Sequence, residues 1–174
     1  MRFLSLCLLF FLLACTATAA EVSTAEGAAA AGEITQEPIG NLAQVMRAIL
    51  FPNSNILFDV QTTDPEAIGA KQEGDRFSGI YKGWQMVEQA AIALAEVEKL
   101  IMVPGRMCEN GKPVPTDQAD FAAWAKALTE AGKATYAAAK DKDQEAVSDL
   151  TNTLAAACED CHTKYRRYED RCRQ

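Results

Sequence analysis

The chain has 174 residues, with 24 Asp and Glu against 17 Lys and Arg and a formal net charge of −7. Nucleic acids are bound by basic surfaces, so an acidic chain of this kind predicts no nucleic-acid partner. Hydrophobic residues make up 49 % of the chain. Its length suits one compact domain, and the composition supplies a core for it.

Residues 1–20 resemble a secretory signal peptide. The apolar run 3–13 follows Arg2 and is too short to span a bilayer, but it has the length of a signal-peptide core. Two cleavage sites compete. The sequence Leu-Leu-Ala-Cys ending at Cys15 resembles a lipobox, and residues 17–19 (Ala-Thr-Ala) form an ordinary small-x-small site. We expect a lipoprotein tethered to a membrane through Cys15, the alternative being that Cys15 is discarded with the signal.

Residues 21–33 are rich in Ala, Thr, Ser and Gly and predict a flexible linker. Removal of the signal takes away Arg2 and no acid, which leaves 16 basic against 24 acidic residues and a net charge of −8. We therefore expect an exported, periplasmic domain over residues 34–174. Its charge predicts salt-sensitive encounters with basic patches of partner proteins.

Apolar residues recur at helical spacing in four blocks of this domain, and alternating strand patterns are nearly absent. The pattern predicts an all-α domain, an antiparallel up-down-up-down four-helix bundle whose interior between facing helices can house a cofactor. The first block runs from Ile39 to Val60 with a kink or break at Pro52; the second runs from Phe77 to Ile101; the third follows a Thr116-Asp117 cap and reaches Ala138; the fourth opens at Asp141, with Gln144 as a capping-box candidate, and reaches Tyr165.

The last block contains Cys158-Glu159-Asp160-Cys161-His162, the C-x-x-C-H signature of covalent haem attachment, and His162 is the chain's single histidine. Positions i, i+3 and i+4 of a helix share one face, so both thiols and the imidazole can reach the same macrocycle. A structural zinc site needs four ligands, and a thioredoxin-like pair needs a strand-to-helix context that is missing here. Both alternatives are therefore weaker than one haem c.

A four-helix chain ending in this motif, followed by an aromatic residue and Arg166, resembles the class II c-type cytochromes, the cytochrome c′ family, over roughly residues 38 to 168. The resemblance implies a haem near one end of the bundle, held by Cys158 and Cys161, with His162 as the fifth iron ligand. It also places Arg166 near the haem and allows a homodimer. The chain departs from the family pattern in two places. Tyr165 stands where the family usually has Phe, and Pro52 lies within the first helix.

In an up-down-up-down bundle the last turns of the fourth helix lie level with the start of the first, near Met46. A thioether sulfur is a sound sixth ligand, and the resemblance implies that low-spin members of the family use a methionine of the first helix in this way. The alternative is that Met46 only packs against the haem. No other methionine fits, because Met86 should lie far down the second helix, and Met102 and Met107 lie at or beyond its end.

The same topology brings Cys108, in the connection between the second and third helices, to the end where Cys172 lies. Exported thiols are usually oxidised, so we expect a disulfide between them, the alternative being two separate thiols.

Five basic residues crowd the C-terminal turns: Lys164, Arg166, Arg167, Arg171 and Arg173. They complement the helix macrodipole, and an alternative role is to dock an acidic partner beside the haem edge.

Nothing in the sequence resembles a catalytic dyad or triad, so we expect no enzyme. The predicted function is a one-electron carrier that serves redox partner proteins. The alternatives are a gas-binding haem protein with an open distal face and, if the C-x-x-C-H is oxidised, a structural lipoprotein without haem.

Overall fold

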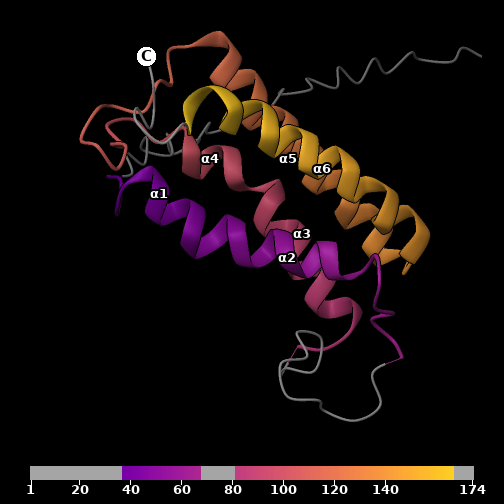
Figure 1. Ribbon diagram of the computed structural model, residues 1–174. Helices are drawn as coiled ribbons and strands as arrows, with labels where there is room; N and C mark the ends of the chain where they lie inside the picture. Colours follow the sequence, from indigo (N-terminus) through magenta and orange to yellow (C-terminus); the bar gives the residue numbers. More distant parts are fainter. Residues whose placement is uncertain (1–36, 68–80, 167–174) are drawn as a thin grey trace, which may run out of the picture. The chain divides into compact units, whose positions relative to one another are not determined.

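The computed structural model describes residues 37–67 and 81–166 (Figure 1). The chain divides into two units, Met1–Ile34 and Thr35–Gln174, and the described residues all belong to the second. The predicted signal peptide, the linker and Cys15 lie outside the described residues and stay predictions. Among the residues that the structure describes, no helix has the length and apolarity that crossing a membrane requires.

The regular elements among the described residues are helices, which confirms the predicted all-α class. The described residues also contain an isolated β-bridge between Met107 and Pro113. The elements in chain order are α1 (Leu42–Val45), the π-helical turn η1 (Met46–Leu50), α2 (Phe51–Asp59), α3 (Trp84–Ala95), α4 (Val97–Ile101), α5 (Ala119–Lys140) and α6 (Gln144–Tyr165). Side chains at helical spacing therefore turn an apolar face inward, as the sequence pattern predicts.

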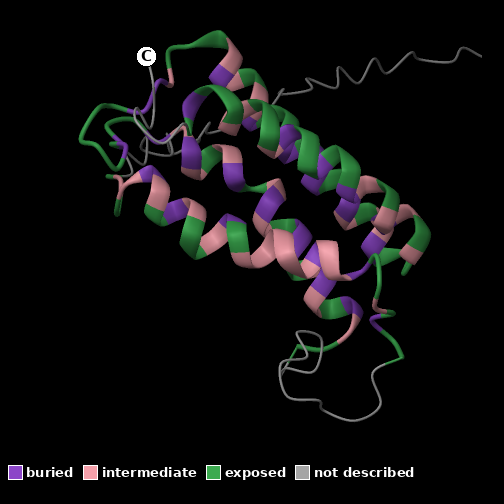
Figure 2. Cartoon of the chain, in the orientation of Figure 1, coloured by how far each residue is buried: buried purple, intermediate pink, exposed green. Residues whose placement is uncertain are grey.

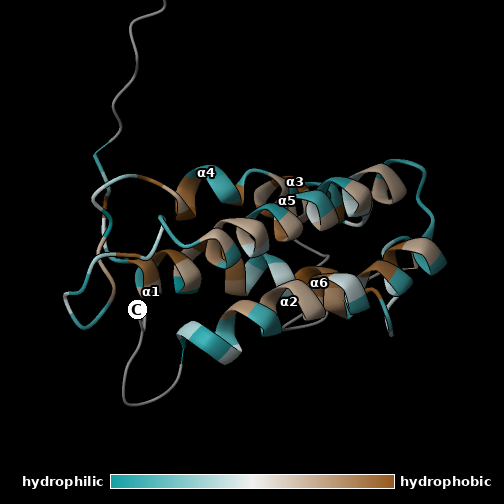
Figure 3. Ribbon diagram, turned by 90° about the horizontal axis from the view of Figure 1, so that it is seen from above, coloured by the Kyte–Doolittle hydropathy of each residue, from teal (hydrophilic) through white to brown (hydrophobic). Residues whose placement is uncertain are grey.

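The core lies where α5 packs against both α3 and α6, and where α2 packs against α3 and α6. Purple, buried segments recur along these helices in Figure 2, and Figure 3 shows hydrophobic positions in brown alternating with hydrophilic ones in teal along the same helices. Completely buried members of the core include Leu57, Val60, Val87, Val147 and Leu154. Each such side chain contributes about 1.5–3 kcal/mol on burial.

Pro52 does not break the first helix, which runs without interruption from Leu42 to Asp59. A proline inside an α-helix leaves the carbonyl four residues earlier without its donor and clashes with it. The π turn η1 ends at Leu50, two residues before Pro52, and in it the backbone hydrogen bonds span five residues instead of four. The N–H of Phe51 donates to the carbonyl of Met46, five residues back. The proline is thus accommodated by a local change of helix type.

The second predicted helix is wrong at both its start and its continuity. Phe77 lies outside the described residues, Tyr81 is exposed and precedes the helix, and α3 begins at Trp84. The helix is then interrupted at Glu96, whose φ and ψ are −98° and 0°. The second predicted helix is therefore two helices, α3 and α4.

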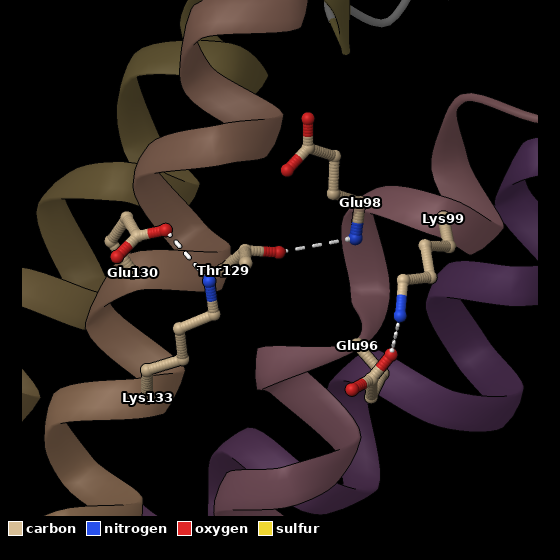
Figure 4. A network of polar contacts seen from close by, with 6 residues as sticks. All are labelled: Glu96, Glu98, Lys99, Thr129, Glu130 and Lys133. Carbon is tan, nitrogen blue, oxygen red and sulfur yellow. Dashed lines mark hydrogen bonds and ion pairs between the residues drawn. The ribbon is translucent and has the colours of Figure 1, made fainter. Parts of the chain in front are cut away.

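The interruption at Glu96 coincides with a close approach of α5 to α3. A Cβ added at Gly132 of α5 would lie 2.5 Å from the nitrogen of Ala95, so the two backbones touch at this point. The hydroxyl of Thr129 accepts a hydrogen bond of 3.2 Å from the N–H of Glu98, which restarts the helix (Figure 4). A side chain of α5 thus supplies the hydrogen-bond acceptor that the N–H of Glu98 lacks within its own interrupted helix.

Two predicted caps are also misplaced. The N-cap residue of α5 is Gln118, and its side chain makes no capping hydrogen bond. The predicted N-cap at Thr116 and Asp117 is therefore wrong. The cap of α6 is Asp143, whose carboxylate accepts from the N–H of Ala146 at 2.9 Å. Asp141 instead ends α5.

Candidate functional site

A cavity of about 650 Å³ lies between η1 and its flanking helices on one side and α5 and α6 on the other. This volume falls within the range of roughly 300–1,000 Å³ that is typical of small-molecule and cofactor sites. Much of its wall is apolar, including Leu50, Phe58, Leu94, Trp124 and Leu128. An apolar planar group of moderate size would find van der Waals contact on several sides.

The last turns of α6 bring Cys158, Cys161 and His162 to the wall of this cavity, and all three side chains are partly buried. Helical spacing puts them on one face, as predicted. Burial raises the pKa of the Cys158 thiol, and burial, helped by Cys158 and Asp120, raises the pKa of Cys161 to about 12. Such thiols are neutral at physiological pH, which does not suit a thiolate redox pair.

The imidazole of His162 is in its neutral form at neutral pH, because burial, with a smaller contribution from the Arg166 charge, lowers its pKa. A neutral imidazole is the form that binds a metal ion. The N–H of Arg166 donates to the carbonyl of His162 at 3.0 Å, and the exposed Arg166 lines the cavity at its edge. The structure therefore places Arg166 beside the histidine, where the resemblance implies that it lies.

Met46 lies on the opposite wall of the same cavity and is partly buried. It is carried by η1, at the start of the π turn. Among the described methionines, Met86, Met102 and Met107 do not line the cavity. The structure thus brings together the four side chains that the sequence analysis selected as tether and ligands.

Two further pairs at the site were not found from the sequence. Arg47 of η1 and Glu109, which precedes α5, both line the cavity and form an ion pair at 3.3 Å between their side-chain atoms. They join elements 62 positions apart in the chain, and no local pattern indicates such a pairing.

The second pair supports the helix that carries the cysteines. The buried Tyr165 donates its hydroxyl to Asp120 of α5 at 2.8 Å, and Lys164 pairs with the same carboxylate. The Tyr165 ring meets Phe121 edge to face at 5.2 Å between centroids, and it meets Trp124 at 6.0 Å. These contacts fix the end of α6 against the start of α5. The sequence showed Tyr165 as a departure from the usual Phe, but nothing in it indicated that Asp120 accepts a hydrogen bond from the Tyr165 hydroxyl.

The donor set fits a haem better than an ion held by the protein alone. Within residues 37–67 and 81–166, no three His, Cys, Asp or Glu side chains are placed to hold a metal ion together. The thiols, the imidazole and the Met46 thioether instead line one apolar cavity from two sides. Two thiols near one imidazole suit thioether links to a porphyrin whose iron the imidazole reaches.

Cys108 is buried, with 2 % of its surface exposed, in the connection between α4 and α5. Its predicted partner Cys172 lies outside the described residues, as do Arg167, Arg171 and Arg173 of the predicted basic rim. The disulfide between Cys108 and Cys172 therefore stays a prediction.

Residues 109–166, which contain α5, α6 and the C-x-x-C-H motif, match the sequence profile of the family described as Cytochrome C'. The match is shorter than the resemblance read from the sequence, and it leaves out the helices before residue 109. No curated protein and no solved structure matches the chain.

Proposed function

We propose that this chain is a haem c protein of the cytochrome c′ family and a one-electron carrier, a proposal supported by the family match at residues 109–166. The observation that carries the proposal is the position of Met46, across one cavity from Cys158, Cys161 and His162. A bound haem supplies an iron that gains or loses a single electron.

Each side chain at the cavity has a distinct part in this function. The thiols of Cys158 and Cys161 would tether the haem covalently, and the neutral imidazole of His162 would bind the iron. The thioether of Met46 would be the second protein ligand of the iron, and His/Met ligation favours electron transfer over the binding of an added ligand. Apolar neighbours such as Trp124 and Leu128 exclude water and limit the reorganisation that electron transfer requires.

The proposal includes the antiparallel up-down-up-down order of the bundle. In Figure 1 the ribbon of α1 begins near the end at which α6 finishes, which is consistent with this order. Met46, near the start of the first helix, and His162, near the end of the last, would then lie at the same level of the bundle.

We propose an exported protein that is tethered through Cys15 and serves redox partner proteins. The acidic charge of the chain supports partners with basic docking patches and gives no support to nucleic-acid binding. Encounter rates should therefore fall as ionic strength rises.

Gas binding is the second candidate, because several of the side chains that line the cavity around Met46 are apolar. Leu42, Leu50 and Phe58 line the cavity on that side and would tolerate a small apolar ligand at the iron. This function applies if Met46 packs against the haem without binding it.

Spectroscopy of the purified haem-loaded protein separates the two candidates. Electron transfer with Met46 as ligand predicts a low-spin ferric iron, the weak red absorption of an iron–sulfur bond, and little affinity of the reduced protein for carbon monoxide. Met46→Leu should turn the iron high-spin and create carbon monoxide binding. The matched control is Met86→Leu in α3, which does not line the cavity and should change neither property. A wild-type protein that is high-spin and binds carbon monoxide would replace electron transfer with gas binding.

Covalent attachment has its own test. Haem should remain with the chain during denaturing electrophoresis, and Cys158→Ala combined with Cys161→Ala should release it. If the double variant keeps its haem, the assignment of the tether is wrong.

A further inference from the structure

We propose that Pro52 and Asn53 are positioning residues, which hold the π turn η1 and thereby turn Met46 toward the cavity. The inference rests on the proposed function, because it concerns the side chain assigned to the sixth iron position. Neither residue lines the cavity, so each acts through the backbone of the helix.

The first argument comes from the angular positions of the residues that line the cavity. Met46 and Phe58 are twelve positions apart, and so are Leu42 and Ser54, and all four line it. In a regular α-helix each residue turns by about 100°, so partners at this separation would point about 120° apart. A π turn takes up one additional residue, which brings each pair to within about 20° of a common direction. The extra residue therefore keeps both ends of this long helix turned toward the cavity.

The second argument explains why the sequence selects the π turn. Pro52 has no N–H to donate and cannot follow a regular α turn without a clash. The N–H of Phe51 donates to the carbonyl of Met46, and the side-chain amide of Asn53 donates to the carbonyl of Ile49 at 2.7 Å. The side chain of Asn53 thus satisfies an acceptor inside η1. Proline disfavours the α alternative and asparagine stabilises the π turn.

The third argument is that α1 is held at its far end. The N–H of Leu42 donates to the carbonyl of Met107 at 2.9 Å, and the buried guanidinium of Arg106 donates to the carbonyls of Ile39 and Gly40 at 3.0 and 2.9 Å. These contacts resist rotation of α1 about its axis. If the segment became a regular α-helix, α1 could not rotate to compensate for the lost π turn. The change in direction of about 100° would then fall on the turn that carries Met46.

The inference is tested by removing the cause of the π turn in the haem-loaded protein. Pro52→Ala combined with Asn53→Ala permits a regular α-helix through this segment, and the side chain of Met46 should then leave the cavity. The measurement is the NMR shift of the Met46 methyl group, labelled with carbon-13, in the reduced diamagnetic protein. A methyl above the haem plane is shifted strongly upfield by the ring current, and this shift should be lost in the double variant.

Two companion variants decide whether any change arises from the turn. Pro38→Ala, a proline removed ahead of α1, should leave the methyl shift in place. Deletion of the exposed Ala48 in the double variant takes out the extra residue, so a regular α-helix then has the correct phase and the upfield shift should return. A double variant that keeps the shift, or a deletion that fails to restore it, would overturn the inference.

These outcomes are separate from those of the proposed function. If Met46 packs beside the haem without binding iron, the wild-type protein is high-spin and the electron-transfer proposal fails. The reduced iron is then also high-spin and paramagnetic, so the methyl shift is measured on the carbon monoxide complex, which is diamagnetic. The ring current still shifts a methyl group that lies over the haem plane in this complex, and the role of Pro52 and Asn53 is judged by that shift. If the double variant is unfolded by circular dichroism, Asn53→Ala alone is compared, and it should reduce the upfield shift; an unchanged shift in that variant counts against the inference.

Discussion

Gly132→Ala should destabilise the protein, although alanine is the better helix former. In the middle of a helix this change gains about 1 kcal/mol from propensity. The added Cβ would lie 2.5 Å from the nitrogen of Ala95, 2.7 Å from the carbonyl carbon of Leu94 and 2.9 Å from the Cα of Ala95. All three are backbone atoms, so no side-chain rotation can relieve the contact, and α3 must move away from α5.

The magnitude follows from what that movement disrupts. Overpacking a close contact typically costs about 1–3 kcal/mol. Separation of the helices also weakens the hydrogen bond from the N–H of Glu98 to Thr129, which is worth about 1 kcal/mol. After the propensity gain, we expect a net loss of about 1–3 kcal/mol and a fall of roughly 2–12 °C in the melting temperature. Because Leu94 also lines the cavity, the haem spectrum should broaden as its wall loosens.

Urea unfolding of the haem-loaded protein, followed by circular dichroism, measures the difference in unfolding free energy. Ala127→Gly, at an exposed position of the same helix, is the matched control and should cost about 1 kcal/mol through propensity alone. If Gly132→Ala is as stable as the wild type or more stable, the close approach of α3 and α5 is not the constraint that we infer.

Three further predictions concern the end of α6 and the adjoining loop. Hydrogen bonds from Lys164 and Tyr165 lower the pKa of Asp120, so its carboxylate stabilises the fold above its unfolded pKa of about 3.9. This contribution is lost as the pH falls through the lower folded pKa, and the advantage of wild type over Asp120→Asn should be constant above about pH 5 and shrink below pH 4. Tyr165→Phe should lower the unfolding free energy by about 1 kcal/mol and raise the pKa of Asp120 in an NMR titration. Peptide mapping without reduction should recover Cys108 joined to Cys172.

Each of these has a result that contradicts it. A wild-type advantage over Asp120→Asn that does not change between pH 3 and pH 6, about one unit below and two units above the ordinary carboxyl pKa, would show that the carboxylate is not stabilised by its partners. An unchanged titration of Asp120 in Tyr165→Phe would mean that the hydroxyl does not donate to it in solution. Recovery of Cys108 and Cys172 as separate thiols would remove the disulfide.

The sequence by itself determined the features that depend on neighbours within one or two helical turns. Apolar periodicity predicts the all-α class, and the spacing of Cys158, Cys161 and His162 predicts one shared face, because the geometry of a helix repeats every 3.6 residues. The family match at residues 109–166 confirms the predicted resemblance over the segment that contains this motif. Even locally the prediction has limits, since Asp143 rather than Asp141 caps α6. Several polar residues near a helix start can serve as a cap, and the one used depends on where the preceding helix ends.

Only the tertiary structure decided the features that join distant parts of the chain. The interruption at Glu96 depends on a glycine of another helix, and the buried hydroxyl of Tyr165 finds Asp120 across 45 positions. The π turn before Pro52 illustrates the division most clearly. The sequence predicts a disturbance at the proline, because the missing N–H is a local fact. Its form, an extra residue that aligns Met46 with the cavity wall, depends on contacts at both ends of the helix, because the anchoring of α1 and α2 by other segments selects among the ways in which a helix can accommodate proline.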